Sequence, residues 1–310
     1  MSVLRIATVT LMGACLSLPA AAQLAFSDSQ SSGPLEITAE QGLELQQDAR
    51  TVIGRGNATA SRNGVTVTAD TLIAHYRNKS EAPGAKPVAA PPPTPAAKTK
   101  DKDGKDPLAG GANGGSGGSE IWRVEAVGHV VIRSATQTAT GDRGDYNIDS
   151  AVVVLTGSGL KLVGPNDIVT ARDSLEYWEN KQQAVARGAA TAQRGDKKVA
   201  ADVLVAQFEK DEQGKMDVRR TMAYDHVVLT TLKDKVTGDR GDYNTQSGIA
   251  TVTGAVKLVR GDNILTGGYA QVNMNTGIST LYPNAPGSSG GDTRVKGLVV
   301  PAQKGAAHHE

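Results

Sequence analysis

A four-residue cassette returns about every thirty residues along this chain. It consists of an apolar residue, Thr or Ala, a small residue and, in most copies, an acid. Measured at its second residue, the spacings are 30, 72, 30, 30, 37 and 29. A repeat of this period is typical of stacked supersecondary units and not of a globule with one central core. The seven copies begin at Ile37, Val67, Ala139, Val169, Val199, Val236 and Leu265.

The interval of 72 residues contains a tract whose composition differs from the rest of the chain. Residues 79–120 are rich in Pro, Ala, Lys and Gly, and removing these 42 residues leaves a spacing of 30. Such a segment cannot bury enough apolar surface to offset the entropy lost on ordering. We therefore expect a disordered insertion at one loop. The interval of 37 carries extra polar residues at 209–214, which we expect to lengthen a hairpin turn.

A second landmark, a Gly followed by alternating apolar and polar residues, runs in step with the cassette. The alternation has a period of two and is rich in Val, Ile and Thr, which favours strands. We predict an all-β fold in which each unit contains two extended segments, one at the cassette and one after the Gly. This landmark occurs at Gly56, Gly128, Gly157, Gly188 and Gly254, with Asp225 in the sixth place.

Residues 1–22 have the pattern of a cleavable export signal. Arg5 gives a positive start, residues 6–18 form an apolar stretch too short to span a bilayer, and three alanines end at Ala22. We expect cleavage after Ala22 and export of the mature chain. Cys15 is the single cysteine and would be removed with this peptide, although lipidation of Cys15 is an open alternative.

Composition and motifs exclude several classes of function. The net charge is +1, so no strong field favours nucleic acid or an anionic surface. The sequence contains no His-Glu-x-x-His zinc motif and no phosphate loop. We therefore expect a protein that is not an enzyme, with no catalytic residues, no metal and no cofactor.

The polar residues of the repeat need a structural or a chemical explanation. Cassette acids could ligate metal, but one acid in each unit favours hydrogen bonding at turns or strand ends. Arg-Gly-Asp occurs four times, beginning at Arg143, Arg194, Arg240 and Arg260, and we expect its Gly-Asp pairs to form turns and not an adhesive motif. The cassette acids are Glu40, Asp70, Asp142, Asp202 and Asp239.

An aromatic residue follows most cassettes, at Tyr76, Tyr146, Tyr177, Phe208 and Tyr243. Together with the export signal, the thirty-residue unit and the Gly landmark, this pattern resembles the LptA/OstA-like family of periplasmic lipopolysaccharide-transport proteins. The resemblance covers roughly residues 34–284 without the insertion. Arg172 and Gly268 replace the acid in two units, and Asp225 replaces a Gly, so the chain departs from the pattern at these positions.

The resemblance implies an OstA-like open β-jellyroll over residues 34–285, interrupted by the insertion, with a disordered tail at residues 286–310. In such a fold two curved antiparallel sheets face each other. The inward half of each alternating strand lines a trough, and burial of acyl methylenes gains about 0.8 kcal/mol each. Strands at the two ends of the stack have unpaired backbone groups and can pair with another chain.

The function implied is that of a periplasmic lipopolysaccharide-binding bridge, which carries lipopolysaccharide from the inner to the outer membrane. The implied partners are the lipid A acyl chains, the inner-membrane export complex, the outer-membrane translocon and further copies of the chain, arranged head to tail. Two alternatives stay open. The first is a membrane-anchored or translocon-associated relative with the same fold, and the second is a β-solenoid protein that binds or cleaves polysaccharide.

We expect lipid contact from apolar members of the alternating strands. A single bulge would move every later side chain to the opposite face, so the facing of each residue depends on where the bulges lie. The expected lipid-contacting residues are Val65, Val67, Val130, Ile132, Val154, Leu160, Leu162, Val169, Val203, Val205, Val227, Leu229, Val256, Leu258 and Ile264.

Overall fold

The computed structural model describes residues 35–83, 118–210, 216–288 and 294–299. The predicted export signal lies outside the described residues, as do residues 84–117 of the predicted insertion and 211–214 of the predicted long turn. The described residues are almost entirely β-strand, with two short 3₁₀ turns, η1 (Lys79–Glu81) and η2 (Glu179–Lys181). None of the helical segments in these ranges has the length and hydropathy to cross a bilayer. The predicted all-β class is confirmed.

The chain divides into two compact units. We call the described part of Ala22–Val163, together with Arg172–Gln183, the N-terminal unit. The C-terminal unit consists of Gly164–Ala171 and the described part of Ala184–Glu310. The region expected from the sequence to be one jellyroll therefore contains two units.

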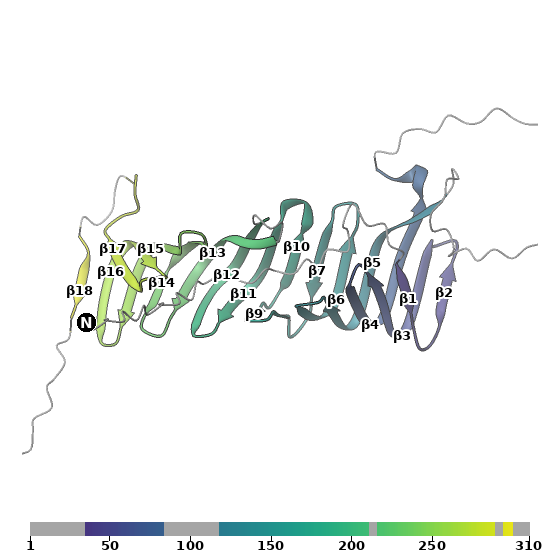
Figure 1. Cartoon of the computed structure of the whole chain (residues 1–310), viewed down its shortest axis with the longest axis horizontal. Coiled ribbons are helices and arrows are strands. Elements are labelled where there is room, and N and C mark those ends of the chain that lie inside the picture. The colour runs from purple at the N-terminus through teal and green to yellow at the C-terminus, as the bar shows by residue number, and fades with distance from the viewer. Residues whose placement is uncertain (1–34, 84–117, 211–215, 289–293, 300–310) are drawn as a thin grey trace, which may run out of the picture. The chain divides into compact units, whose positions relative to one another are not determined.

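Strands of the N-terminal unit pair antiparallel, mostly with their neighbours in sequence (Figure 1). β3 is also paired by β1 and β2, and β6 is paired by both β7 and β8. The strands are β1 (Glu36–Thr38), β2 (Leu43–Gln46), β3 (Thr51–Arg62), β4 (Val65–Asn78), β5 (Ser119–Arg133), β6 (Thr138–Asn147), β7 (Val152–Thr156), β8 (Lys161–Val163) and β10 (Ser174–Trp178).

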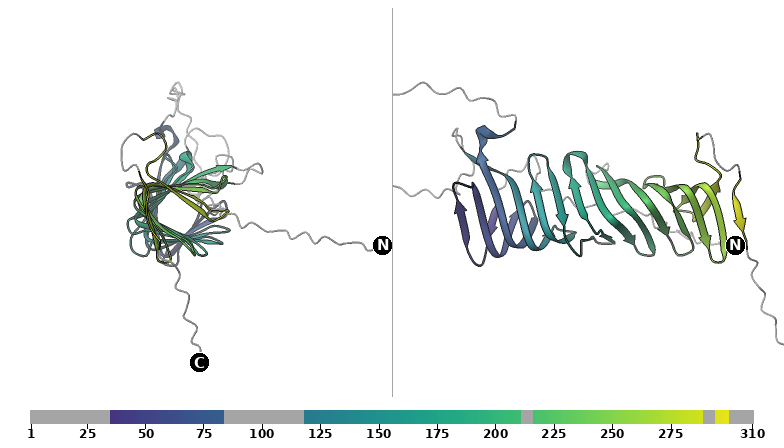
Figure 2. Two further views of the ribbon diagram at one scale, coloured as in Figure 1. Left: turned by 90° about the vertical axis from the view of Figure 1, so that its left-hand side faces the viewer. Right: turned by 180° about the vertical axis from the view of Figure 1, so that it is seen from behind.

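Strands of the C-terminal unit form a similar antiparallel series from β12 to β17, and β9 pairs with β11. Figure 2 shows, end on, that the green to yellow strands of this unit curve and do not lie in one plane. The strands are β9 (Asp167–Thr170), β11 (Gln183–Arg194), β12 (Lys197–Lys210), β13 (Met216–Thr230), β14 (Lys235–Asn244), β15 (Ile249–Arg260), β16 (Asn263–Asn273), β17 (Ile278–Tyr282) and β18 (Lys296–Leu298).

Hairpin turns explain part of the Arg-Gly-Asp pattern. Gly195-Asp196 and Gly261-Asp262 connect consecutive strands, as predicted, and both glycines have positive φ. The copies at Arg143 and Arg240 lie inside β6 and β14, so the prediction of turns was wrong there. The reason is that a Gly inside a strand also allows close packing on one face: a Cβ on Gly144 would contact Leu155, Val130 and Ala126.

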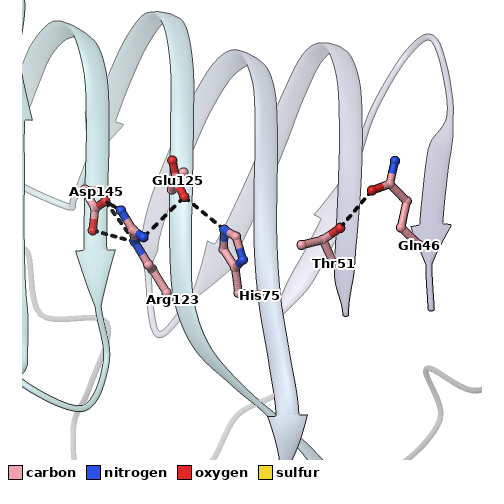
Figure 3. A network of polar contacts seen from close by, with 6 residues as sticks. All are labelled: Gln46, Thr51, His75, Arg123, Glu125 and Asp145. Atoms are coloured by element: carbon pink, nitrogen blue, oxygen red, sulfur yellow. Dashed lines mark hydrogen bonds and ion pairs between the residues drawn. The ribbon is translucent and has the colours of Figure 1, made fainter. Parts of the chain in front are cut away.

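One face of the N-terminal unit is polar. On this face His75 Nε2 lies 2.9 Å from Glu125 Oε1, and Arg123 pairs with Asp145 and lies 3.6 Å from Glu125 (Figure 3). Thr51 donates a hydrogen bond of 3.4 Å to Gln46 on the same face. Such a row of partly exposed ion pairs fixes which side of each strand meets solvent, although each pair contributes little to stability.

The opposite face of the N-terminal unit is apolar and buried. Strand register places Leu155 opposite Gly144, Gly144 opposite Ala126, and Ala126 opposite Leu72. Of these, Leu72 and Leu155 are each 1% exposed. This face forms the core of the unit, and we call it the inner face. The corresponding inner face of the C-terminal unit includes Val236, Val252, Val256, Leu258 and Ala270, which form one buried cluster.

A short strand lies within the tail that we expected to be unstructured. β18 pairs with β16 through Lys296, Gly297 and Leu298, so the expectation fails for these residues. All three residues are exposed, and Leu298 is 61% exposed. Backbone hydrogen bonding to an edge can therefore order a segment whose side chains bury little, which composition alone does not reveal.

Two adjacent substitutions test the assignment of the inner face in the N-terminal unit. Leu155→Ala should lower the free energy of unfolding by about 2–5 kcal/mol, because Leu155 is buried and its removal leaves a cavity. Val154→Ala should cost less than about 1 kcal/mol, because Val154 pairs with Asp145 on the polar face. Chemical denaturation of both variants measures the difference. Equal losses for the two would contradict the assignment.

Candidate functional site

The repeated cassette lies at a bend in the middle of each long strand. Pairing of β4 with β5 continues to Thr68, skips two residues and resumes at Thr71, so Ala69 and Asp70 lie at a bulge. Equivalent shifts follow Ala200 in β12 and Thr237 in β14. The prediction of turn or strand-end positions was therefore wrong for Asp70, Asp202 and Asp239, since a mid-strand bulge produces the same periodicity as a turn. Glu40 lies just after the end of β1, as predicted, and accepts a hydrogen bond from Asn57.

The Gly landmark forms the other half of this bend, on the neighbouring strand. Gly128 and Gly254 both have φ of +80°, in the left-handed region that favours glycine. The next residues, His129 and Ala255, also have positive φ, at 45° and 40°. Asp225, which replaces the Gly in β13, has φ of 61°, which Asp tolerates better than most residues.

Cassette acids hydrogen-bond across to the Gly landmark. Asp70 Oδ2 lies 2.8 Å from His129 Nδ1, and Asp202 Oδ2 lies 2.9 Å from His226 Nδ1. At the corresponding place Asp142 accepts bonds of 2.6 and 2.7 Å from the backbone N–H and hydroxyl of Ser158. These acids hold the bend between adjacent strands. No group of three His, Cys, Asp or Glu residues suited to a metal ion occurs in the described ranges.

These contacts shift the protonation of several exposed groups. The hydrogen bond that His129 donates to Asp70 raises the pKa of His129 above its usual value, and the bond that His226 donates to Asp202 does the same for His226. Hydrogen bonds from Ser158 lower the pKa of Asp142. The imidazoles and carboxylates are solvent-exposed, so they form no enclosed acid–base site. Their hydrogen bonds connect the two strands at the bend.

Strand alternation reverses its parity at the bend, so that residues on both sides of the bulge contribute to the inner face. In β12, Val199 faces inward before the bulge, whereas Leu204 and Ala206 face inward after it, as their pairings with Leu229, Ala223 and Thr221 show. A Cβ added to Gly241 would contact both Val227 and Ala223, which lie on opposite sides of the β13 bulge. The two halves of each strand therefore cover a common interior.

Four residues expected to contact lipid lie on the other face. Val154 pairs with Asp145, Val203 with Tyr224, and Val205 with Met222, which pairs in turn with Asp242. Ile264 pairs with Val259, one position away from the inward pair of Leu258 and Leu265. Parity was wrong for Val154, Val203 and Val205 because breaks in the regular pairing shift the alternation by one residue. Pairing is regular from Leu258 to Ile264, so the hairpin turn between β15 and β16 determines the facing of Ile264.

The remaining expected residues lie on the inner faces. Six belong to the N-terminal unit: Val65, Val67, Val130, Ile132, Leu160 and Leu162. Five belong to the C-terminal unit: Val169, Val227, Leu229, Val256 and Leu258. All are buried except Leu162, Val169 and Leu229, which are half-buried. Contact with lipid stays a prediction for all eleven.

An open apolar pocket lies on the inner face of the C-terminal unit. The space between its walls, including open solvent, is about 640 Å³. Val227 and Leu229 were expected from the sequence, whereas the contributions of β14 and β15 were missed. Gly254 of the Gly landmark is the sequence signal for the bulge in β15, and this bulge determines which side chains of β15 face the pocket. The lining residues are Ala192, Arg194, Lys197, Lys198, Val199, Thr221, Ala223, Val227, Leu229, Gly241, Asp242, Tyr243, Ala250, Thr251, Val252 and Met274.

Comparisons with known proteins find similarity in sequence and in structure. A family model described as LptA/(LptD N-terminal domain) LPS transport protein matches residues 36–173 and again residues 169–278. A search of curated proteins finds no match. Among solved structures, the chain is similar to LptH from Pseudomonas aeruginosa, described as the LptA homologous periplasmic component of the lipopolysaccharide transport device. Identity is 17%, with 44% of this chain and 95% of LptH covered and a TM-score of 0.38.

Substitution of a bend glycine should destabilise the protein more than substitution of a turn glycine. Gly261→Ala should cost only the penalty of a left-handed backbone, about 1–2 kcal/mol. It adds no steric clash, because no atom lies within 4 Å of the added Cβ. Gly254→Ala incurs the same penalty and places its Cβ against the Asp239 carboxylate, so we expect roughly 2–4 kcal/mol. Urea unfolding of both variants checks this. A smaller loss for Gly254→Ala would show that the bend accommodates a side chain.

The bend also predicts a pH dependence. Because the folded-state pKa of His226 is raised, the stabilisation from its ion pair with Asp202 is fully present below the unfolded pKa. That stabilisation is lost as pH rises through the folded pKa. NMR titration should show His226 titrating above its ordinary value, with a lower pKa in Asp202→Asn. The stability difference between wild type and this variant should shrink over the same pH window, and a pH-independent difference would contradict the assignment.

Proposed function

Because the chain belongs to the LptA/LptD N-terminal domain family of lipopolysaccharide-transport proteins, we propose that it is a periplasmic bridge that carries lipopolysaccharide between the membranes. The observation that carries this proposal is the apolar inner face, which both halves of each bent strand line. Acyl chains of lipid A would lie against this face, and each buried methylene would gain about 0.8 kcal/mol. The sugar headgroup would stay in solvent.

Export to the periplasm is part of this proposal and depends on residues 1–22, whose composition is that of a cleavable signal. The proposed partners are the inner-membrane export complex, the outer-membrane translocon and further copies of this chain. Edge strands support this assignment, since β1 and β2 in the N-terminal unit are short and exposed and can accept another strand.

The alternative is that the chain acts as a membrane-associated or translocon-associated relative of the bridge. The family description includes the N-terminal domain of LptD, so family membership alone fits both roles. We favour the bridge because the composition of residues 1–22 is that of a cleavable signal, with small residues where cleavage is expected. Fractionation of cells that express the full sequence distinguishes the two, because a bridge is released with the periplasm.

Site-specific photo-crosslinking tests lipid binding. A photoreactive residue at Leu258, on the inner face, should give a lipopolysaccharide adduct in a cell that makes this lipid. The same residue at Lys257 should give little or none, because Lys257 is exposed and alternation directs it to the other side. Leu162 and Lys161 provide the equivalent pair in the N-terminal unit. Detection is by immunoblot for lipopolysaccharide.

Absence of adducts from both inward positions, in variants that retain the wild-type circular dichroism spectrum, would overturn the transport proposal. Equal adducts at inward and outward positions would show that contact with lipid is not confined to the inner face. Either result is informative, because the paired positions differ by one residue along the same strand.

A further inference from the structure

A row of polar residues lies at one end of the inner face of the C-terminal unit, next to the hairpin turns. By strand alternation, Lys197 faces the same side as Val199, Asp234 the same side as Val236, and Arg260 the same side as Leu258. Asp167 and Arg194, which pair across β9 and β11, occupy the same level beside Val169 and Ala192. We call these five residues the inner polar row.

Two of the three cations in the inner polar row are neutralised within the row. Arg194 donates bonds of 2.5 and 2.7 Å to Asp167, whose exposure is 5%. Arg260 donates bonds of 2.5 and 2.6 Å to Asp234, whose exposure is 7%. These bidentate contacts occupy both carboxylates and satisfy the buried acids. They leave no acid of the row for Lys197.

Lys197 is the remaining cation, and it lines the apolar pocket. It is half-buried, and no acid in the described ranges lies within ion-pair distance of its ammonium group. Asp242, the acidic residue of the lining, pairs with Arg220 on the far side of its strand. A partly desolvated ammonium beside an apolar wall favours an anion as its partner.

The wall next to Lys197 is apolar. Val199 and Leu229 lie directly opposite each other on β12 and β13, and the pocket continues along Val227, Ala223 and Val252. These residues offer surface for an acyl chain, and the nearby Arg194 is held by Asp167. Lys198 also lines the pocket, but it is exposed and follows Lys197 by one residue, so alternation directs it away from the inner face. The chemistry of the pocket therefore changes from cationic at the turn end to apolar along its length.

We propose that this pocket binds an anionic amphiphile, with the acyl chain along Val227 and Leu229 and the negatively charged group at Lys197. The proposal rests on the proposed lipid-carrying function and adds to it the orientation of the lipid in the C-terminal unit. Charge complementarity with the one unpaired cation of the inner polar row is the argument for this occupant.

Calorimetric titration of the full mature chain with two twelve-carbon probes tests the proposal. Dodecyl phosphate carries an anionic head and dodecyl maltoside a neutral one, and both are used below their micelle concentrations. Lys197→Gln should weaken binding of dodecyl phosphate about tenfold, the loss of one charge-assisted contact, and leave dodecyl maltoside unchanged. Lys257→Gln removes the same charge from the other face and should change neither affinity. Circular dichroism verifies that both variants fold.

Four outcomes would overturn the proposal. Equal weakening of both probes by Lys197→Gln would assign Lys197 a packing role, and no effect on either would remove it from the site. Inorganic phosphate binding as tightly as dodecyl phosphate would assign the site to a free anion. If the wild type binds neither amphiphile, the pocket takes no acyl chain. Only this last result, together with failed crosslinking at Leu258, would also count against the transport function.

Discussion

The hydrogen bond between a cassette acid and the residue after the left-handed position of the Gly landmark, which is Gly128 in β5 and Asp225 in β13, is the interaction on which this architecture depends. It occurs at Asp70 with His129 and at Asp202 with His226, and it stabilises a bulge at the same level in successive strands. Without the bulge, an alternating strand would direct every second residue to one side along its full length. With it, parity shifts by one residue, and each strand curves while keeping its apolar side chains on one interior.

The sequence predicted the repeat, the strand content and the family, but not the facing of every strand. Val130 and Val227 could be assigned correctly because they lie on the expected side of their bulges. Val203, Val205 and Val154 could not, because the position of the extra residue decides their facing and two-residue periodicity contains no information about it. For Ile264 the length of the hairpin turn before β16 decides the facing. The Gly landmark is the sequence signal that would have located the bulges, because its glycine and the residue after it both have positive φ.

Side-chain chemistry was harder to predict than backbone form. The buried pairs of Asp167 with Arg194 and Asp234 with Arg260 join residues 26 or 27 positions apart, close to one period of the repeat. The sequence showed these arginines only as parts of Arg-Gly-Asp motifs. Their role became visible when register placed each next to a buried acid on the adjacent strand. The ion pairs within the inner polar row leave Lys197 without an acidic partner in the row. This follows from the register of the strands and could not be read from the composition.

β18 has a practical consequence for the choice of boundaries. Composition favours ending the folded region near residue 285, but Lys296–Leu298 complete the pairing of β16 beyond that point. A protein shortened there would present bare backbone donors and acceptors of β16 beside the apolar Leu265. Such an edge is a template for unplanned strand pairing in concentrated solution. β18 thus covers the backbone of β16 that would otherwise be exposed where the repeat ends.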